Sequence, residues 1–133
     1  MSGKYFVLGA VLIGLVIVSA CSPTTGRLSS PAEWVAQDPQ QLMTHGQKIY
    51  VEFCAECHQT DGTGWSTLYP RLAGNPIVTL HDPEPIIVTV KYGQGSMAAF
   101  GERISSPDIA AVLTYIRNSW GNHADPVSPR QVQ

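Results

Sequence analysis

A Cys-x-x-Cys-His run at Cys54-Ala55-Glu56-Cys57-His58 constrains this chain more than any other feature. Two thiols separated by two residues can each bond to one of the two vinyl groups on a haem edge, and the next residue can ligate the iron through its imidazole. On a helical turn these side chains converge on one small region. The run therefore predicts one covalent c-type haem, held by Cys54 and Cys57, with His58 as an axial ligand.

Two other uses of a cysteine pair are less consistent with the sequence. A redox-active dithiol of the thioredoxin kind follows a strand in a βαβ pattern, and no such pattern precedes Cys54. A structural zinc site needs four ligands, usually from a second Cys or His pair, whereas His45, His81 and His123 are scattered along the chain. Haem attachment is the prediction that the spacing favours.

Residues 1–21 have the pattern of a targeting segment. Lys4 precedes an apolar run from Tyr5 to Val18, and small residues then lead to Cys21, which resembles a bacterial lipoprotein box with lipid attached at that cysteine. An ordinary cleaved signal and an uncleaved anchor helix are the alternatives. The run is short against the roughly 20 residues that span a bilayer, which favours a signal. In the lipid and the anchor interpretations alike, we expect a membrane-anchored domain on the periplasmic or extracytoplasmic face.

The composition of the chain excludes some classes of binding partner. The 133 residues carry a formal net charge of −2 and contain no lysine cluster, which argues against nucleic acid binding and against a basic docking ring. Residues 22–39 are rich in Ser, Thr, Pro, Ala and Gln and predict a linker. We expect one domain over 40–122. The tail at 123–133 contains two prolines and is expected to be disordered or bound to a partner.

The remaining segments predict helices separated by loops. An apolar pattern at three- and four-residue steps predicts a helix over about 40–53, started by Asp38 and Pro39. Gly46 inside it favours a close crossing with the last helix. A second helix is expected from Pro85 to near residue 93, although its β-branched residues make a strand the rival interpretation. The last helix is expected to start with Ser106 as N-cap, carry an apolar face through residue 120, and stop at 121–122.

Two further residues are candidates for the haem site. A ligating histidine needs its other ring nitrogen hydrogen-bonded, and the carbonyl of Pro70 is the candidate acceptor for His58. Met97 lies in a small-residue loop over 93–101, and its thioether suits haem iron as the second axial ligand. Other residues could occupy that position, or it could have no protein ligand. The other candidate residues are Met43, His45, His81 and His123.

Together these features resemble the class I c-type cytochromes, the single-haem bacterial members in particular. The resemblance covers about residues 40–122 and rests on the CAECH run, Pro70-x-Leu72, the GQGSMAAF loop and the closing DIAAVLTYIRNSWGN segment. It implies an all-α fold in which the first and last helices cross around one haem c, with Gly46 near Tyr115. It also implies His58 and Met97 as axial ligands. Ala98 stands where many relatives carry proline.

A haem iron with two protein ligands has no vacant position for a substrate. We therefore expect an electron-transfer protein and not an enzyme, which exchanges single electrons with membrane redox proteins of respiration or photosynthesis. A quinol-oxidising complex, a terminal oxidase and a dehydrogenase are the expected kinds of partner, and the chain is expected either to move between them or to be a fixed subunit. The alternative is an open-site haem protein for gas sensing or small-molecule catalysis, which would require that Met97 does not ligate iron.

Overall fold

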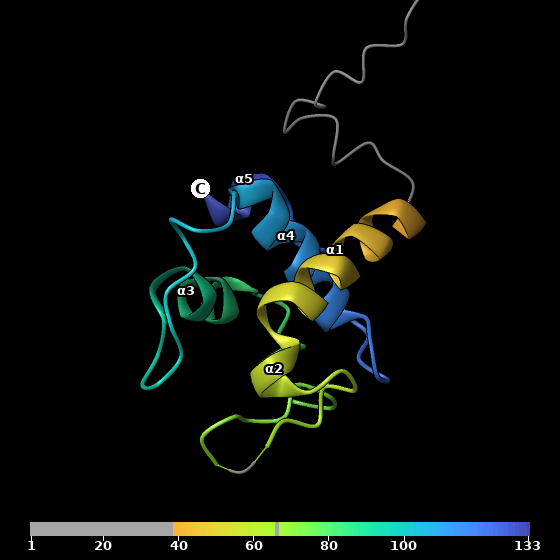
Figure 1. The fold of residues 1–133 in the computed structure, drawn as a ribbon. Coiled ribbons are helices and arrows are strands. Elements are labelled where there is room, and N and C mark those ends of the chain that lie inside the picture. The colour runs from red at the N-terminus through yellow and green to blue at the C-terminus, as the bar shows by residue number, and fades with distance from the viewer. Residues whose placement is uncertain (1–38, 66) are drawn as a thin grey trace, which may run out of the picture.

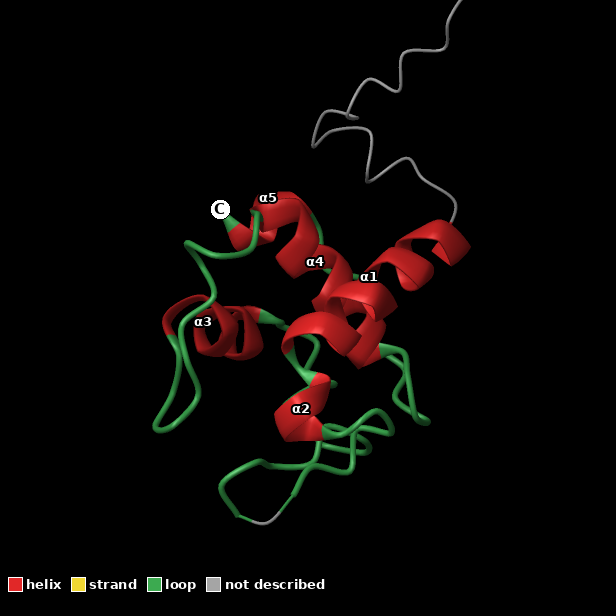
Figure 2. Ribbon diagram, viewed as in Figure 1, coloured by secondary structure: helices red, strands yellow, loops and turns green. Residues whose placement is uncertain are grey.

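The computed structural model describes residues 39–65 and 67–133. In this part the chain forms helices joined by loops and contains no strand, so the predicted all-α class is confirmed (Figure 2). The helices are α1 (Pro39–Phe53), α2 (Ala55–His58), α3 (Glu84–Tyr92), α4 (Ser106–Arg117) and α5 (Pro129–Val132). The targeting segment, Cys21 and the predicted linker up to residue 38 lie outside the described residues, and Pro39, the last residue of that predicted linker, is the first residue of α1. Within the described residues, no helix has the length and apolar character to cross a bilayer.

The crossing of α1 and α4 forms the centre of the fold (Figure 1). Gly46 lies at the contact: a Cβ atom there would overlap the carbonyl oxygen of Ala111 and come within 2.8 Å of the Tyr115 Cβ. The two backbones can approach this closely only because Gly46 lacks a side chain. The predicted crossing, with Gly46 near Tyr115, is confirmed.

The start of α4 differs from the prediction by one residue. Ser105, not Ser106, is the N-cap, and its Oγ accepts a hydrogen bond from the Asp108 backbone N–H at 3.3 Å while donating to Asp108 Oδ2 at 2.6 Å. Asp108 stands three residues after Ser105, which is the spacing of a reciprocal cap. The other carboxylate oxygen of Asp108 lies 2.7 Å from Nε2 of His45 on α1, so the cap also joins the two crossing helices.

The end of α4 also differs, because the helix stops at Arg117 instead of continuing to Trp120. Trp120 has a φ of 54°, which is not a helical value, so its side chain does not continue the apolar face of α4. Its indole packs on Gly62 and its Nε1–H donates to the Thr60 carbonyl at 3.2 Å. The segment after α4 therefore supports the loop that follows the cysteine motif.

Helix α3 begins within one residue of the predicted position, and the rival interpretation of this segment as a strand is wrong. Its β-branched residues serve packing, since Ile86 and Ile87 are buried against the core. A helix can be formed here because Pro85 stands in its first turn, where no backbone donor is needed. The loop that starts at Gly93 follows it directly.

The C-terminal segment is folded onto the domain, so the expectation of a disordered or partner-bound tail is wrong. Val127 and Val132 are buried, and the Val127 backbone N–H donates to Thr114 Oγ1 on α4 at 2.9 Å. Ser128 and Gln131 form a capping box that starts α5. Two buried valines and a satisfied cap stabilise a segment whose proline content had suggested disorder.

Candidate haem site

The cysteine motif follows helix α1 directly and packs against the core. The Cys54 backbone N–H donates to the Tyr50 carbonyl at 2.9 Å, and after a short break α2 continues from Ala55. The His58 N–H donates to the Cys54 carbonyl, also at 2.9 Å, so the motif forms one helical turn. Cys54 and Cys57 are free thiols and both are half-buried. This turn brings two thiols and one imidazole together, as the spacing predicts.

The ring of His58 is buried and its orientation is fixed. Its Nδ1 lies 2.9 Å from the carbonyl oxygen of Pro70. A carbonyl oxygen can only accept, so Nδ1 carries the proton and donates, and in the neutral ring Nε2 keeps its lone pair. The expected hydrogen bond between His58 and Pro70 is present. It selects the tautomer that a metal-ligating histidine needs.

A closed loop brings Pro70 to this position. The Gly64 N–H donates to the His58 carbonyl at 2.9 Å, and the Trp65 N–H donates to the Tyr69 carbonyl at 2.8 Å. Gly64 has a φ of +67°, and a Cβ atom on it would collide with the Tyr69 carbonyl oxygen and lie 2.7 Å from that of Pro70. Gly64 is not among the site residues predicted from the sequence, where it is one glycine among several in a loop.

The chemistry of the donor set fits haem c better than either alternative. Burial, with a smaller contribution from Cys57, raises the pKa of the Cys54 thiol to about 12, whereas a redox-active dithiol needs a lowered thiol pKa. Among the described residues no three His, Cys, Asp or Glu side chains gather as a metal cluster would require. Two free thiols beside an imidazole with an available Nε2 match thioether attachment and axial ligation.

Aromatic contacts join the cysteine motif to the loop that carries Met97. The ring of Phe53, directly before Cys54, meets the ring of Phe100 edge to face with centroids 6.4 Å apart. Phe100 comes three residues after Met97. The loop is itself closed by two hydrogen bonds between the backbones of Gln94 and Met97, at 3.0 and 3.2 Å. The fold thus places a methionine-bearing loop beside the attachment segment, although the two are 39 residues apart in sequence.

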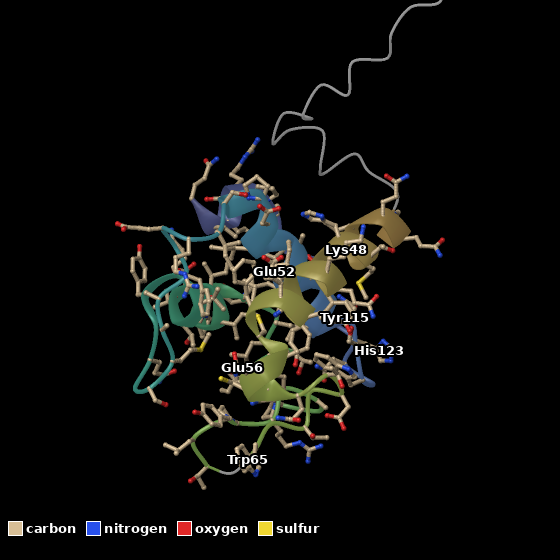
Figure 3. The ribbon with its side chains drawn as sticks, viewed as in Figure 1. Lys48, Glu52, Glu56, Trp65, Tyr115 and His123 are labelled. Atoms are coloured by element: carbon tan, nitrogen blue, oxygen red, sulfur yellow. The ribbon has the colours of Figure 1, made fainter. Side chains whose placement is uncertain are left out.

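Two of the competing histidines have partners elsewhere. His45 Nε2 pairs with Asp108 Oδ1 at 2.7 Å, between α1 and α4. His81 is almost fully exposed, with its Nδ1 3.5 Å from Asp125 Oδ2. His123, labelled in Figure 3, is also exposed, beyond the end of α4. These placements favour Met97 over the histidines, and its ligation of iron stays a prediction.

The loop beyond His58 also presents apolar surface. Trp65 is 70% exposed and Leu68 is 66% exposed. Figure 3 shows Trp65 on this loop, past Glu56 of α2. Leu72, two residues after Pro70, is half-buried against the core cluster. The loop that brings the Pro70 carbonyl to His58 therefore also presents apolar side chains, which suit the surroundings of a porphyrin.

Comparison with known proteins finds cytochromes c and cytochrome subunits of larger enzymes. Residues 41–116, more than half of the chain, match the family model described as cytochrome c oxidase, cbb3-type, subunit III. Cytochrome c-552 of Thermus thermophilus is 34% identical over 92 residues, which cover 58% of this chain and 69% of the relative. The cbb3-type cytochrome c oxidase subunit CcoP of Rubrivivax gelatinosus is 32% identical over 91 residues, covering 67% of this chain and 29% of the relative.

A further group of relatives consists of subunits of dehydrogenases. The cytochrome c subunit of alcohol dehydrogenase (quinone) from Gluconobacter oxydans is 34% identical over 90 residues, covering 59% of this chain. The match spans only 19% of that relative's length. The chain therefore corresponds to about a fifth of a much longer protein in this comparison.

Proposed function

The chain belongs to the family of cytochrome c oxidase, cbb3-type, subunit III, and on this premise we propose that it passes single electrons between redox proteins at a membrane. It carries one covalent haem c, and it is an electron-transfer protein and not an enzyme. The observation that carries the proposal is the geometry of the CAECH turn. His58 is oriented there by the Pro70 carbonyl, within the segment that matches the family.

Each site residue has a distinct task in this proposal. Cys54 and Cys57 would hold the porphyrin through thioether bonds, so that it would stay with the protein in both oxidation states. His58, through Nε2, and Met97, through its thioether, would be the protein ligands of the haem iron. The haem supplies the exchange between ferric and ferrous iron. The Pro70 carbonyl keeps the proton on Nδ1 of His58 and so maintains the ligating tautomer.

The relatives suggest the kind of assembly. Their names describe cytochrome subunits of dehydrogenases and a subunit of a cbb3-type oxidase. We propose that this chain likewise works within, or docks to, a larger complex. A dehydrogenase or a quinol-oxidising complex would be the donor, and a terminal oxidase the acceptor.

Isolation of the native complex tests this proposal. The tagged protein, extracted from its own membranes in a mild detergent, is expected to co-purify with redox subunits of a dehydrogenase, a quinol-oxidising complex or an oxidase. Mass spectrometry identifies the companions, and the visible spectrum after addition of a quinol shows whether the haem becomes reduced within the assembly. Recovery of the protein alone, with a haem that neither quinol nor oxygen affects in the presence of those membranes, would contradict the proposal.

Anchoring belongs to the same proposal. We propose that the domain is held on the periplasmic face by lipid on Cys21, which supports short-range exchange with membrane partners. Acyl chains contribute about 0.8 kcal/mol per buried methylene, so two or three of them hold a small domain firmly. The pattern of small residues before Cys21 supports this assignment.

Cys21→Ser is expected to block lipid transfer and the cleavage that follows it. The variant should therefore have a higher polypeptide mass than the wild-type protein, because residues 1–20 are retained. Intact mass spectrometry of both proteins measures the difference, with Ser22→Ala as the matched control. A wild-type species that begins at Met1 and carries no acyl mass would show that the uncleaved anchor is correct.

A further inference from the structure

The loop that carries Met97 is fixed at both ends to the last turn of α3. Gly93 leaves the helix directly, and on the return the Phe100 N–H donates to the Val90 carbonyl at 2.9 Å. The next residue, Gly101, donates its N–H to the Lys91 carbonyl at 3.0 Å. The position of the loop therefore depends on where the backbone of residues 90 and 91 is held.

The side chain of Lys91 connects this turn to the C-terminal segment. Its Nζ donates to the Val132 carbonyl at 2.6 Å and to the Gln133 carbonyl at 3.1 Å. The acceptors lie at the end of α5, where carbonyl groups have no partner within the helix and a cation is favoured. Figure 1 shows the C-terminal end of the chain close to α3. Hydrogen bonds from a charged donor are about twice as strong as neutral ones.

The C-terminal end of this connection is packed into the core. The side chain of Val132 is fully buried, and Val127 is held to Thr114 of α4 by its N–H bond to Oγ1. Helix α4 in turn crosses α1, which leads directly into the cysteine motif. A continuous set of contacts thus runs from the crossing helices through the C-terminal segment to Lys91.

We propose that Lys91 is a positioning residue for the Met97 loop. Its ammonium group, held by the carbonyls of Val132 and Gln133, fixes the loop to the C-terminal segment and so keeps the thioether of Met97 in place for the iron. This inference rests on the proposed ligation of iron by Met97. The restraint on the loop backbone itself follows from the contacts of Lys91 alone.

Lys91→Met tests the inference in the haem-loaded protein, because it keeps the aliphatic chain and removes the donor. We expect hydrogen exchange of the amides of Phe100 and Gly101 to become about ten-fold faster. The weak red-end absorption band of methionine-ligated ferric haem should lose intensity, and reduced protein should gain a fraction that binds carbon monoxide. Lys91→Arg keeps a charged donor and should restore all three readings toward wild type.

Controls separate this role from general stability. Lys48→Met makes the same change on the exposed face of α1 (Figure 3) and should leave all three readings unchanged. Removal of residues 129–133 should loosen the loop at least as much as Lys91→Met does, and adding Lys91→Met to the truncated protein should change the exchange rates little further, because the acceptors of Lys91 are already gone. If Lys91→Met does not fold, the truncated protein still gives the exchange rates.

The outcomes distinguish the two proposals. Unchanged exchange at Phe100 and Gly101 in Lys91→Met, or in the truncated protein, would overturn the inference. A different result is faster exchange in Lys91→Met with a visible spectrum that neither Lys91→Met nor Met97→Ala changes. That result would refute ligation of iron by Met97 and would retain the restraint of Lys91 on the loop.

Discussion

Replacing Cys54 and Cys57 with alanine is expected to abolish covalent haem and to leave most of the chain unfolded. The described domain is small, and a domain of this size buries too little apolar surface to be strongly stable on its own. Anything bound only by the folded state adds to its stability, and a covalently held porphyrin does so without dissociating. Haem staining on a denaturing gel measures the attachment, and far-ultraviolet circular dichroism measures the helix content.

Val51→Ala is the matched control for this double change. Val51 is 58% exposed on α1, three residues before Cys54, and its truncation should affect neither staining nor helix content. Haem staining of the double alanine variant equal to that of the wild type would show that the thiols do not attach the cofactor.

Met97→Ala is expected to open the second axial position of the iron. Loss of the thioether should lower the reduction potential by on the order of 100 mV or more, because methionine favours the ferrous state and axial ligands set potentials over about 0.8 V. The red-end band should disappear, and the reduced variant should bind carbon monoxide rapidly. Redox titration and flash photolysis of the carbon monoxide complex measure the two effects.

Met43→Ala, on α1, serves as the control because it removes another thioether without touching the loop. Its spectrum and potential should match those of the wild type. Rapid binding of carbon monoxide by reduced wild-type protein would argue against a closed electron carrier and would favour an open site for gas sensing or catalysis.

Parts of the fold could be predicted from single residues because their effect is local. The chemistry of Cys54, Cys57 and His58 depends on spacing within one helical turn, and Pro85 stands in the first turn of α3. Gly46 is a longer-range case that was also predicted correctly, since a glycine lowers helix propensity and is favoured inside a helix where another backbone approaches closely. The folded chain places it against Ala111.

The N-cap of α4 is harder to predict from sequence, because two neighbouring residues have the same intrinsic preference for the N-cap position. Ser105 and Ser106 are equally good N-caps by residue type. Asp108 decides between them, since it exchanges hydrogen bonds with Ser105 and reaches His45 on another helix. That second contact spans 63 residues and is invisible to any local pattern.

Residue chemistry at short spacing was enough to predict the haem c cofactor and the hydrogen bond between His58 and the Pro70 carbonyl, and helical periodicity was enough to predict the all-α architecture. The course of the C-terminal segment and the hydrogen bonds of Lys91 depend instead on contacts between distant parts of the chain. Val132 is buried by such contacts, and Lys91 finds its acceptors 41 and 42 positions away. The sequence alone does not show whether a lysine at the end of a helix donates its hydrogen bonds to water or to a backbone carbonyl, because the carbonyl comes within reach only when the chain folds.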